Sequence, residues 1–216
     1  VFCRHITLPS VSCPWNISME RDHQKRHLKR ALRRSIKKSI LGLDPGVRAA
    51  EEAELIAQFP ALPGYAAAHT VLLYVTAFAE EINTRSFFLH AMAAGKRVLC
   101  PRVQREKNRM RLFQITSLSA NLEPGILGIP EPRDGCAEVE VAEVDWALIP
   151  GLAFDSRCYR LGRGGGLYDR LLPGMRPDAT CWALGFDCQI APELPIEPHD
   201  VPIDGVATPR RIFDRR

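Results

Sequence analysis

The sequence predicts a three-layer α/β fold with a largely parallel sheet, and three observations support this prediction. Short apolar or β-branched runs alternate with segments of helical periodicity, which is typical of a sheet covered by helices on both faces. The chain has 216 residues, 46% of them hydrophobic, so it can bury one substantial core and is short for two enzymatic domains. No internal repeat or low-complexity tract divides it. We therefore expect one domain over residues 19–216 and a disordered or non-native extension over residues 1–18.

A basic amphipathic helix is expected first, over residues 21–41. Its apolar positions recur at intervals of four and define one face, formed by Leu28, Leu32, Ile36 and Ile40. Lys29 and Arg33 lie beside this face, one turn apart. Nine lysines or arginines and a single acid occur between residues 21 and 38, so this helix can attract anions.

A second helix and a β-α-β unit follow. Asp44 before a proline is typical of a helix N-terminus, and this helix is expected to reach about residue 58. Residues 70–75 and 97–100 are expected to be strands, joined by a helix over 84–94 that a glycine closes. Further strands are expected at residues 109–116, 145–149, 181–186 and 206–208, with mostly connection over 117–140.

Composition excludes several classes of protein. The net charge of +4 does not by itself indicate a nucleic-acid partner, and no stretch of 18 apolar residues suggests a membrane span. The seven cysteines are odd in number and scattered, without a C-x-x-C pair, which argues against a disulfide framework or a zinc site. We expect a cytoplasmic protein with no nucleic-acid or membrane partner. The sequence leaves the oligomeric state open, with a monomer favoured.

The most informative segment runs from Pro150 to Arg170 and follows an apolar strand. Its second half, residues 160–170, holds four glycines and three arginines. Glycine lets backbone N–H groups turn toward an anion, and arginine adds charge-assisted hydrogen bonds, so a polyphosphate is the natural ligand. The spacing matches neither a P-loop nor a dinucleotide fingerprint. From the residues alone the prediction is an anion site, and the alternative is a surface turn.

This segment resembles the signature of the 5-formyltetrahydrofolate cyclo-ligase family, also called methenyltetrahydrofolate synthetases. The resemblance covers about residues 25–208, with weaker supporting segments in the order of the family at 29–33, 74–84, 95–102, 128–132 and 199–205. It implies a single Rossmann-like domain with a mostly parallel, partly mixed sheet.

The resemblance also implies an activity. The small-molecule substrate would be 5-formyltetrahydrofolate, converted with ATP and Mg²⁺ to 5,10-methenyltetrahydrofolate, ADP and phosphate. Phosphorylation of the formyl oxygen and attack by N10 would close the ring. The alternative is a non-catalytic folate or nucleotide sensor of the same fold.

Residues that match the ATP site of the family lie in two segments. Lys29 and Arg33 would contact the phosphates, and ATP would lie along Arg160, Leu161, Gly162, Arg163, Gly164, Gly165, Gly166, Leu167 and Tyr168. Arg163 is the expected catalytic residue, because a planar guanidinium suits a phosphoryl group in transfer. The other basic residues of the first helix, Lys37 and Lys38 included, have no match and are expected to be surface charge. Without the resemblance, Lys29 and Arg33 would be assigned to a solvated helix face.

The folate and metal residues follow from the same resemblance. The folate would be bordered by Thr76, Glu81, Arg163, Gly164, Gly165, Gly166 and Leu167, and Mg²⁺ would be held near Asp169 and Asp200. Alternatives remain for the polar residues. Thr76 can be a turn hydroxyl, Glu81 an acid preceding a helix, Asp169 a partner of Arg170, and Asp200 a turn residue.

Several of these polar groups follow predicted strands. Glu81, Arg102, the glycine-rich segment and Asp200 each come after a strand, so we expect them to converge on one cleft at the carboxyl edge of the sheet. Two positions depart from the family. Leu167 replaces the first of a usual tyrosine pair, and Cys158 stands where a glycine is common.

Overall fold

The main element of the fold is a mixed sheet of eight strands among the described residues. The computed structural model describes residues 14–104, 106–125 and 128–215, with side chains from residue 23 onward. The strands are β1 (Thr70–Leu72), β2 (Arg97–Gln104), β3 (Arg109–Ile115), β6 (Glu138–Val139), β7 (Trp146–Leu148), β10 (Thr180–Leu184), β11 (Gly205–Ala207) and β12 (Ile212–Asp214). Their order is β12-β11-β10-β7-β1-β2-β3-β6. The five central strands are parallel, and antiparallel strands flank them on both sides. The predicted α/β class is confirmed.

The predicted β-α-β unit is present as β1, α3 (Arg85–Ala93) and β2. However, β2 continues beyond Pro101, where we expected it to end. Leu99 accepts a hydrogen bond from Leu73 on the β1 side. Pro101 lies two residues later in β2, so its backbone points toward the same neighbouring strand as that of Leu99. Strand β1 has already ended at this level, so the N–H that proline lacks is not needed for a hydrogen bond. The strand can therefore continue as a hairpin with β3.

Helix α1 (Pro14–Leu41) is longer than expected and includes residues 14–18, whereas residues 1–13 lie outside the described part of the chain. Ile36 and Ile40 are buried as predicted, but Leu28 is 50% exposed and Lys29 is 7% exposed. With 3.6 residues per turn, a spacing of four drifts by about 40° per step, so Leu28 has rotated about 120° from Ile40. Lys29 takes its place on the inner face.

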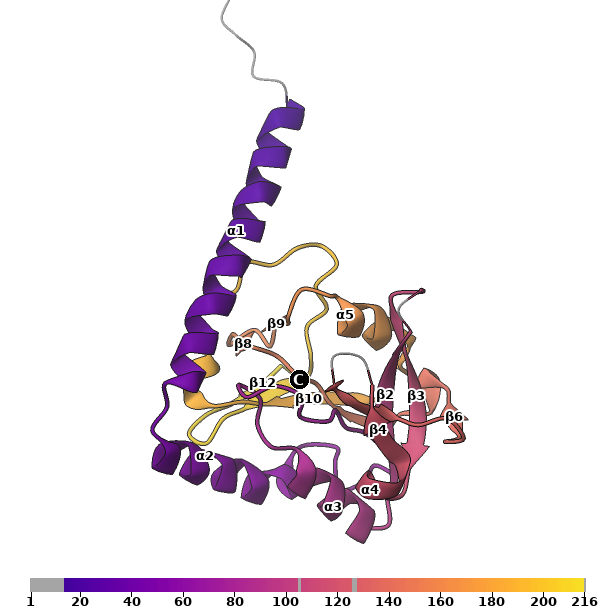
Figure 1. Cartoon of the computed structure of the whole chain (residues 1–216). Coiled ribbons are helices and arrows are strands. Elements are labelled where there is room, and N and C mark those ends of the chain that lie inside the picture. Colours follow the sequence, from indigo (N-terminus) through magenta and orange to yellow (C-terminus); the bar gives the residue numbers. More distant parts are fainter. Residues whose placement is uncertain (1–13, 105, 126–127, 216) are drawn as a thin grey trace, which may run out of the picture.

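Helix α2 (Pro45–Gln58) begins where the sequence indicated. The Asp44 side chain accepts hydrogen bonds from the backbone N–H of Gly46 at 2.8 Å and of Val47 at 3.2 Å. Figure 1 shows α1 along one side of the molecule, with its N-terminal part projecting beyond the sheet, and α2 and α3 along the lower edge of this view. No helix in the described part of the chain has the length and apolar character needed to cross a bilayer.

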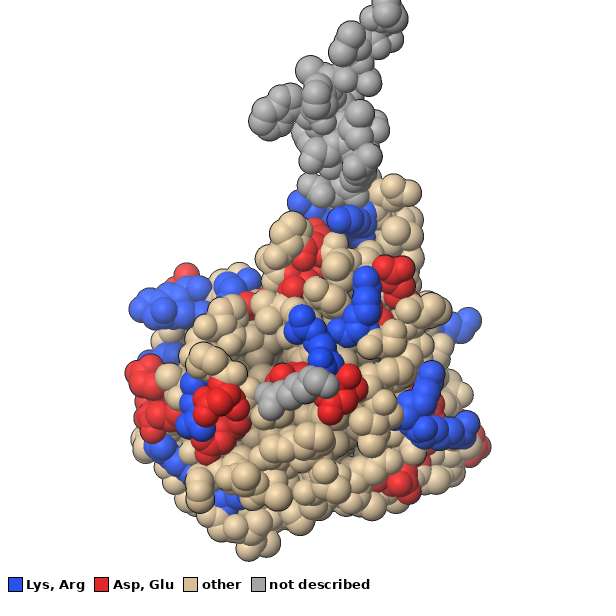
Figure 2. Space-filling model, turned by 180° about the vertical axis from the view of Figure 1, so that it is seen from behind, with Lys and Arg blue, Asp and Glu red and all other residues tan. Residues whose placement is uncertain are grey.

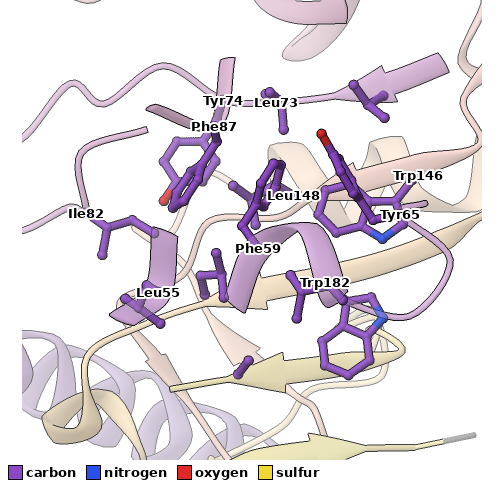
Figure 3. Packing of buried hydrophobic residues seen from close by; sticks show 14 of the residues in the cluster. Leu55, Phe59, Tyr65, Leu73, Tyr74, Ile82, Phe87, Trp146, Leu148 and Trp182 are labelled. Carbon is purple, nitrogen blue, oxygen red and sulfur yellow. The ribbon is translucent and has the colours of Figure 1, made fainter. Parts of the chain in front are cut away.

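The core lies on both faces of the sheet. Along β7, Trp146 and Leu148 belong to one buried cluster and Ala147 to another, as expected for a strand covered on both sides. Aromatic rings fill the larger cluster, where Phe59 lies 4.4 Å from Tyr65 and 4.7 Å from Phe87 between ring centroids (Figure 3). The same cluster includes Leu73 and Leu148, at the carboxyl ends of β1 and β7, from which the loops of the site emerge.

The sequence did not predict several short elements. The segment expected to be connection holds α4 (Leu118–Asn121), β4 (Leu122–Pro124) and β5 (Pro130–Pro132). A second small hairpin, β8 (Ala153–Phe154) with β9 (Arg160–Leu161), leads into α5 (Leu167–Leu171). Strands of two or three residues are too short to show an alternating pattern.

Candidate active site

A cavity of about 300 Å³ opens at the carboxyl edge of the sheet. Most of its lining comes from five segments that are distant in sequence: residues 74–82, 100–103, 129–131, 150–152 and 160–169. The predicted convergence is therefore confirmed for Glu81 and the glycine loop, which we define as residues 160–166. It was wrong for Arg102, which pairs with exposed Asp134 at 2.9 Å and stacks on Phe113.

The glycine loop takes a path that needs glycine at two positions. Gly164 has φ +103° and Gly166 has φ +61°, both in the left-handed region. Gly164 also lies against α1, because a Cβ there would be 3.5 Å from the Arg33 guanidinium. Gly162, Gly165 and Gly166 line the cavity together with Arg160 and Arg163. The loop thus presents backbone and guanidinium donors to the same space.

Of the two predicted basic residues of α1, Arg33 contacts this loop and Lys29 contacts the C-terminal loop that holds Asp200. Arg33 donates from Nε to the carbonyl oxygen of Gly162 at 2.8 Å. Lys29 is buried, with its Nζ 2.6 Å from Glu197 Oε2 and 2.6 Å from Asp200 Oδ2. On the face in Figure 2, basic and acidic side chains lie side by side at the foot of the projecting helix. The solvated-face alternative is excluded for Lys29 and does not describe half-buried Arg33.

Arg163 extends from the loop to the segment over residues 77–82. Its guanidinium lies 2.9 Å from Glu80 Oε1 and 3.2 Å from Glu81 Oε1, and it stacks 3.5 Å above the Phe78 ring. The carboxylate of Glu80 also pairs with Lys37 Nζ at 3.1 Å. Lys37 is 49% exposed, as expected for a surface charge, but its partner is a buried acid.

Asp169 and Asp200 belong to neighbouring ion pairs. Asp169 Oδ1 accepts from buried Arg160 at 2.8 Å and from the backbone N–H of Val201, next to Asp200, at 3.2 Å. The two predicted metal residues therefore lie close together. Arg170, the alternative partner expected for Asp169, does not pair with it. Arg170 donates instead to the carbonyl oxygens of Asn108 and Gly165.

Glu81 lies in the cavity wall, whereas Thr76 lines an adjoining hollow. Glu81 Oε2 accepts from the backbone N–H of Ala77 at 2.8 Å and of Phe78 at 3.3 Å. Thr76 donates its hydroxyl to the carbonyl oxygen of Ile82 at 2.7 Å. Both side chains thus shape the 77–82 turn, and of the two only Glu81 reaches the cavity.

The remaining loop residues divide between cavity and core. Leu161 is buried, and Tyr168 lines the cavity with Tyr74. Burial raises the pKa of both tyrosines, so these phenols remain neutral donors at physiological pH. Leu167 also lines the cavity. Cys158 is buried with φ +60°, so it keeps the left-handed conformation of the glycine that is common there.

Sequence reasoning missed four polar residues near the site. Glu80 and Glu131 are buried, the latter in the cavity wall, and Glu197 and His199 lie within 4.8 Å of Asp200. Glu197 could have been noticed, because an acid three residues before a predicted metal ligand in the same loop is a natural partner for a nearby lysine. Glu80 gave no such signal, since an acid in a loop is normally exposed.

Known proteins match this chain both in sequence and in fold. A model of the 5-formyltetrahydrofolate cyclo-ligase family matches residues 23–209. The 5-formyltetrahydrofolate cyclo-ligase of Escherichia coli K12 is 32% identical over 155 residues, which are 70% of this chain and 84% of the relative. The Mus musculus protein of that name is 32% identical over 136 residues, which are 59% of this chain and 67% of the relative. The NMR structure of Aquifex aeolicus 5,10-methenyltetrahydrofolate synthetase superposes with a TM-score of 0.76 at 30% identity, covering 88% of this chain and 93% of that chain.

Proposed function

Because the chain belongs to the 5-formyltetrahydrofolate cyclo-ligase family, we propose that its cavity carries out the ATP-dependent conversion of 5-formyltetrahydrofolate to 5,10-methenyltetrahydrofolate. One observation supports this most directly. The glycine loop lies between basic helix α1 and the cavity, joined to the helix by the bond from Arg33 to Gly162. A triphosphate on this loop would have the cavity of about 300 Å³ beside it.

The proposed chemistry needs positioning and charge neutralisation. The γ-phosphoryl group is transferred to the formyl oxygen as its bond to ADP breaks. The N10 nitrogen then attacks the formyl carbon and loses its proton to solvent, and phosphate leaves with the former formyl oxygen. No protein nucleophile is required, so the rate depends on alignment and on cations around the phosphoryl group.

Three basic residues supply those cations. Arg163, on the rim of the cavity, would stabilise the phosphoryl group in transfer, because its planar fork can bind two oxygens at once. Arg33 would contact the phosphates from the side of α1. Lys29 would do so from its position between Glu197 and Asp200.

Asp169 and Asp200 fit a magnesium site. Both are carboxylates, the ligands that Mg²⁺ prefers, and the backbone bond from Val201 to Asp169 keeps them close together. Hydrogen bonds engage Oδ1 of Asp169 and Oδ2 of Asp200, and Oδ1 of Asp200 lies 3.8 Å from His199 Nε2, so these two carboxylates would hold the ion beside His199. Bound Mg²⁺ would neutralise charge on the phosphates.

The folate would occupy the part of the cavity lined by Glu81, Leu167 and glycines 165 and 166. The Glu81 carboxylate suits the N–H donors of a pterin. Arg163 also lines the cavity and would border the folate, whereas Gly164 and Thr76 would do so less directly, since neither lines the cavity. The apolar lining, which includes Phe78, Pro101 and Leu152, suits the faces of a flat ring.

A spectroscopic assay tests the activity and separates it from the sensor alternative. Protein, ATP, Mg²⁺ and 5-formyltetrahydrofolate are mixed, and near-ultraviolet absorbance is followed for the methenyl product. We expect product to form only when all components are present. Binding of both ligands without product would instead support a sensor. The curated relatives are named as ligases, which favours the catalytic function.

The role of Arg163 is tested with two variants. Arg163→Lys keeps a cation next to Glu80 but loses the planar fork, and we expect turnover to fall about 100-fold while the fold is preserved. Arg163→Ala should lose still more. Turnover equal to wild type in folded Arg163→Lys contradicts the assignment.

We further propose that the protein acts as a monomer in a reducing compartment such as the cytoplasm. Five cysteines of the described residues are free, which is consistent with such a compartment. Sedimentation of the purified chain with and without a reducing agent tests the oligomeric state, and localisation of the fluorescently tagged chain in cells tests the compartment. A dimer that persists in reducing agent contradicts the monomer.

A further inference from the structure

Glu80 is a buried acid that joins three segments around the cavity. Its side chain is 2% exposed, and its Oε1 lies 2.9 Å from Arg163 on the glycine loop and 3.1 Å from Lys37 on α1. The proposed reaction assigns no role to Glu80. A buried carboxylate between two cations from separate elements controls where those cations can go.

The contacts of Arg163 show what is being controlled. The guanidinium binds Glu80 and Glu81 and stacks on Phe78, all within the 77–82 segment. A phosphate bound on the glycine loop must therefore compete with two carboxylates for this arginine. The cost of that exchange enters the affinity for the nucleotide directly.

Lys37 determines how large the cost is. If Arg163 moves to a phosphate, Glu80 would be left as an unpaired buried charge, which proteins rarely tolerate. Lys37 already contacts the same oxygen and can remain there. Burial alone would raise the pKa of Glu80, but hydrogen bonds from its own backbone, Lys37 and Arg163 bring the pKa below its ordinary value.

We propose that Glu80 is a positioning residue that holds Arg163 in a resting place away from the phosphates, and that Lys37 stabilises Glu80 when the arginine is released to the nucleotide. This inference rests on the proposed function, in which Arg163 contacts phosphate. It deepens that function by assigning regulation of nucleotide affinity to a pair of residues outside the phosphate site.

A double-mutant cycle tests the proposal. The dissociation constant of adenylyl imidodiphosphate with MgCl₂ is measured by calorimetry on the full chain. Glu80→Gln removes the competing charge, and we expect the nucleotide to bind five- to tenfold more tightly. Lys37→Met makes Glu80 hold Arg163 more strongly, and we expect binding to weaken five- to tenfold.

The control is Lys38→Met, which removes the same charge from the next, exposed residue of α1. We expect a change of twofold or less. In the Glu80→Gln background, the change in dissociation constant caused by Lys37→Met should shrink to that of this control, because residue 80 is no longer charged. A purely structural role for Glu80 cannot give tighter binding.

The outcomes separate this inference from the proposed function. If wild type does not bind the nucleotide, or Arg163→Lys binds it equally well, the assignment of Arg163 to phosphate is wrong. If Arg163→Lys weakens binding but Glu80→Gln does not tighten it, only the role of Glu80 is overturned. If Glu80→Gln fails to fold, the two lysine variants still test the role of Glu80. Equal changes in nucleotide affinity for Lys37→Met and Lys38→Met would overturn that role.

Discussion

The Nε atom of Arg33 donates a 2.8 Å hydrogen bond to the carbonyl oxygen of Gly162, across 129 residues of sequence. This bond sets the distance between α1 and the glycine loop. Gly164 lies next to the same guanidinium, and its φ of +103° is one that favours glycine. Arg33 therefore has two roles: it supplies positive charge beside the glycine loop, and its hydrogen bond holds that loop in position.

Replacing Arg33 with lysine separates these two contributions. Arg33→Lys keeps the charge but loses the Nε donor and the planar group, so the loop is less well fixed. We expect KM for ATP to rise about tenfold, which corresponds to about 1.4 kcal/mol of lost interaction, with KM for the folate little changed. Steady-state kinetics with each substrate varied in turn measures both constants.

Arg30→Lys is the matched control, because Arg30 lies on the same helix and is exposed. It should leave both KM values unchanged. Equal effects of Arg30→Lys and Arg33→Lys, or a rise confined to the KM of the folate, would show that the bond to Gly162 does not serve the nucleotide.

Lys29 connects α1 to the C-terminal loop as well as to the site. Lys29→Met leaves Glu197 and Asp200 facing each other without their shared cation. We expect the free energy of unfolding to fall by about 2–3 kcal/mol at pH 7, because like charges remain partly buried. Denaturant unfolding measures this. Arg30→Met, which removes a neighbouring exposed charge, should cost less than about 0.5 kcal/mol, and a similar cost for both variants would contradict the prediction.

The same contact makes stability depend on pH. The hydrogen bond from Lys29 lowers the pKa of Glu197, although burial opposes it, so the folded pKa lies below the ordinary 4.5. The carboxylate therefore stabilises the fold fully above about pH 4.5, and this contribution is lost as the pH falls through the folded pKa.

We expect Glu197→Gln to be less stable than wild type at pH 7 and the difference to shrink at pH 3. Unfolding in urea at both pH values measures the difference. Glu193→Gln serves as the control, because Glu193 lies in the same loop and is largely exposed. A difference for Glu197→Gln that is constant from pH 7 to pH 3 would rule out this linkage.

Much of the fold could be predicted because its signals are local. The cap at Asp44 and the alternation of strands 70–72 and 97–104 with a helix depend on residues close in sequence. Convergence of Glu81 and the glycine loop also followed, because parallel strands bring their carboxyl ends to one edge.

What could not be predicted depends on pairing between distant residues. Lys29 lies on the inner face because residues spaced by four rotate by about 40° around the helix at each step. A pattern of apolar residues at that spacing does not reveal the rotation. The pairing of Glu80 with Lys37 and Arg163 joins three segments, and no local pattern marks it. The roles of Thr76, Asp169 and Asp200 remain predictions that rest on the resemblance.

Leu167 offers a test of substrate contacts. It lines the cavity as the first residue of α5, where the family resemblance expects a tyrosine. Leu167→Tyr adds a hydroxyl to the cavity wall, and one new hydrogen bond is worth about 1 kcal/mol. We expect KM for 5-formyltetrahydrofolate to fall about fivefold with KM for ATP unchanged. Leu167→Phe, which adds the ring without the hydroxyl, is the control, and an equal effect of both variants would assign the gain to ring packing.

Cys158 shows how the chain keeps a turn that favours glycine. Its φ of +60° costs a non-glycine residue about 1–2 kcal/mol, yet its buried side chain recovers part of this through contacts such as that of Sγ with the carbonyl oxygen of Phe213. Cys158→Ala loses those contacts and keeps the strain, whereas Cys158→Gly loses them and relieves it.

We therefore expect an order of stability that reverses the usual one. At most positions alanine is more stable than glycine by about 0.5–1 kcal/mol, but here Cys158→Gly should equal or exceed Cys158→Ala, by up to about 1 kcal/mol. Thermal unfolding of the two variants measures the order. At Cys181, a buried strand cysteine, the same pair of substitutions should follow the usual order. If alanine is the more stable at both positions, the backbone at Cys158 carries no strain and the turn leading into the glycine loop does not depend on a glycine-like residue.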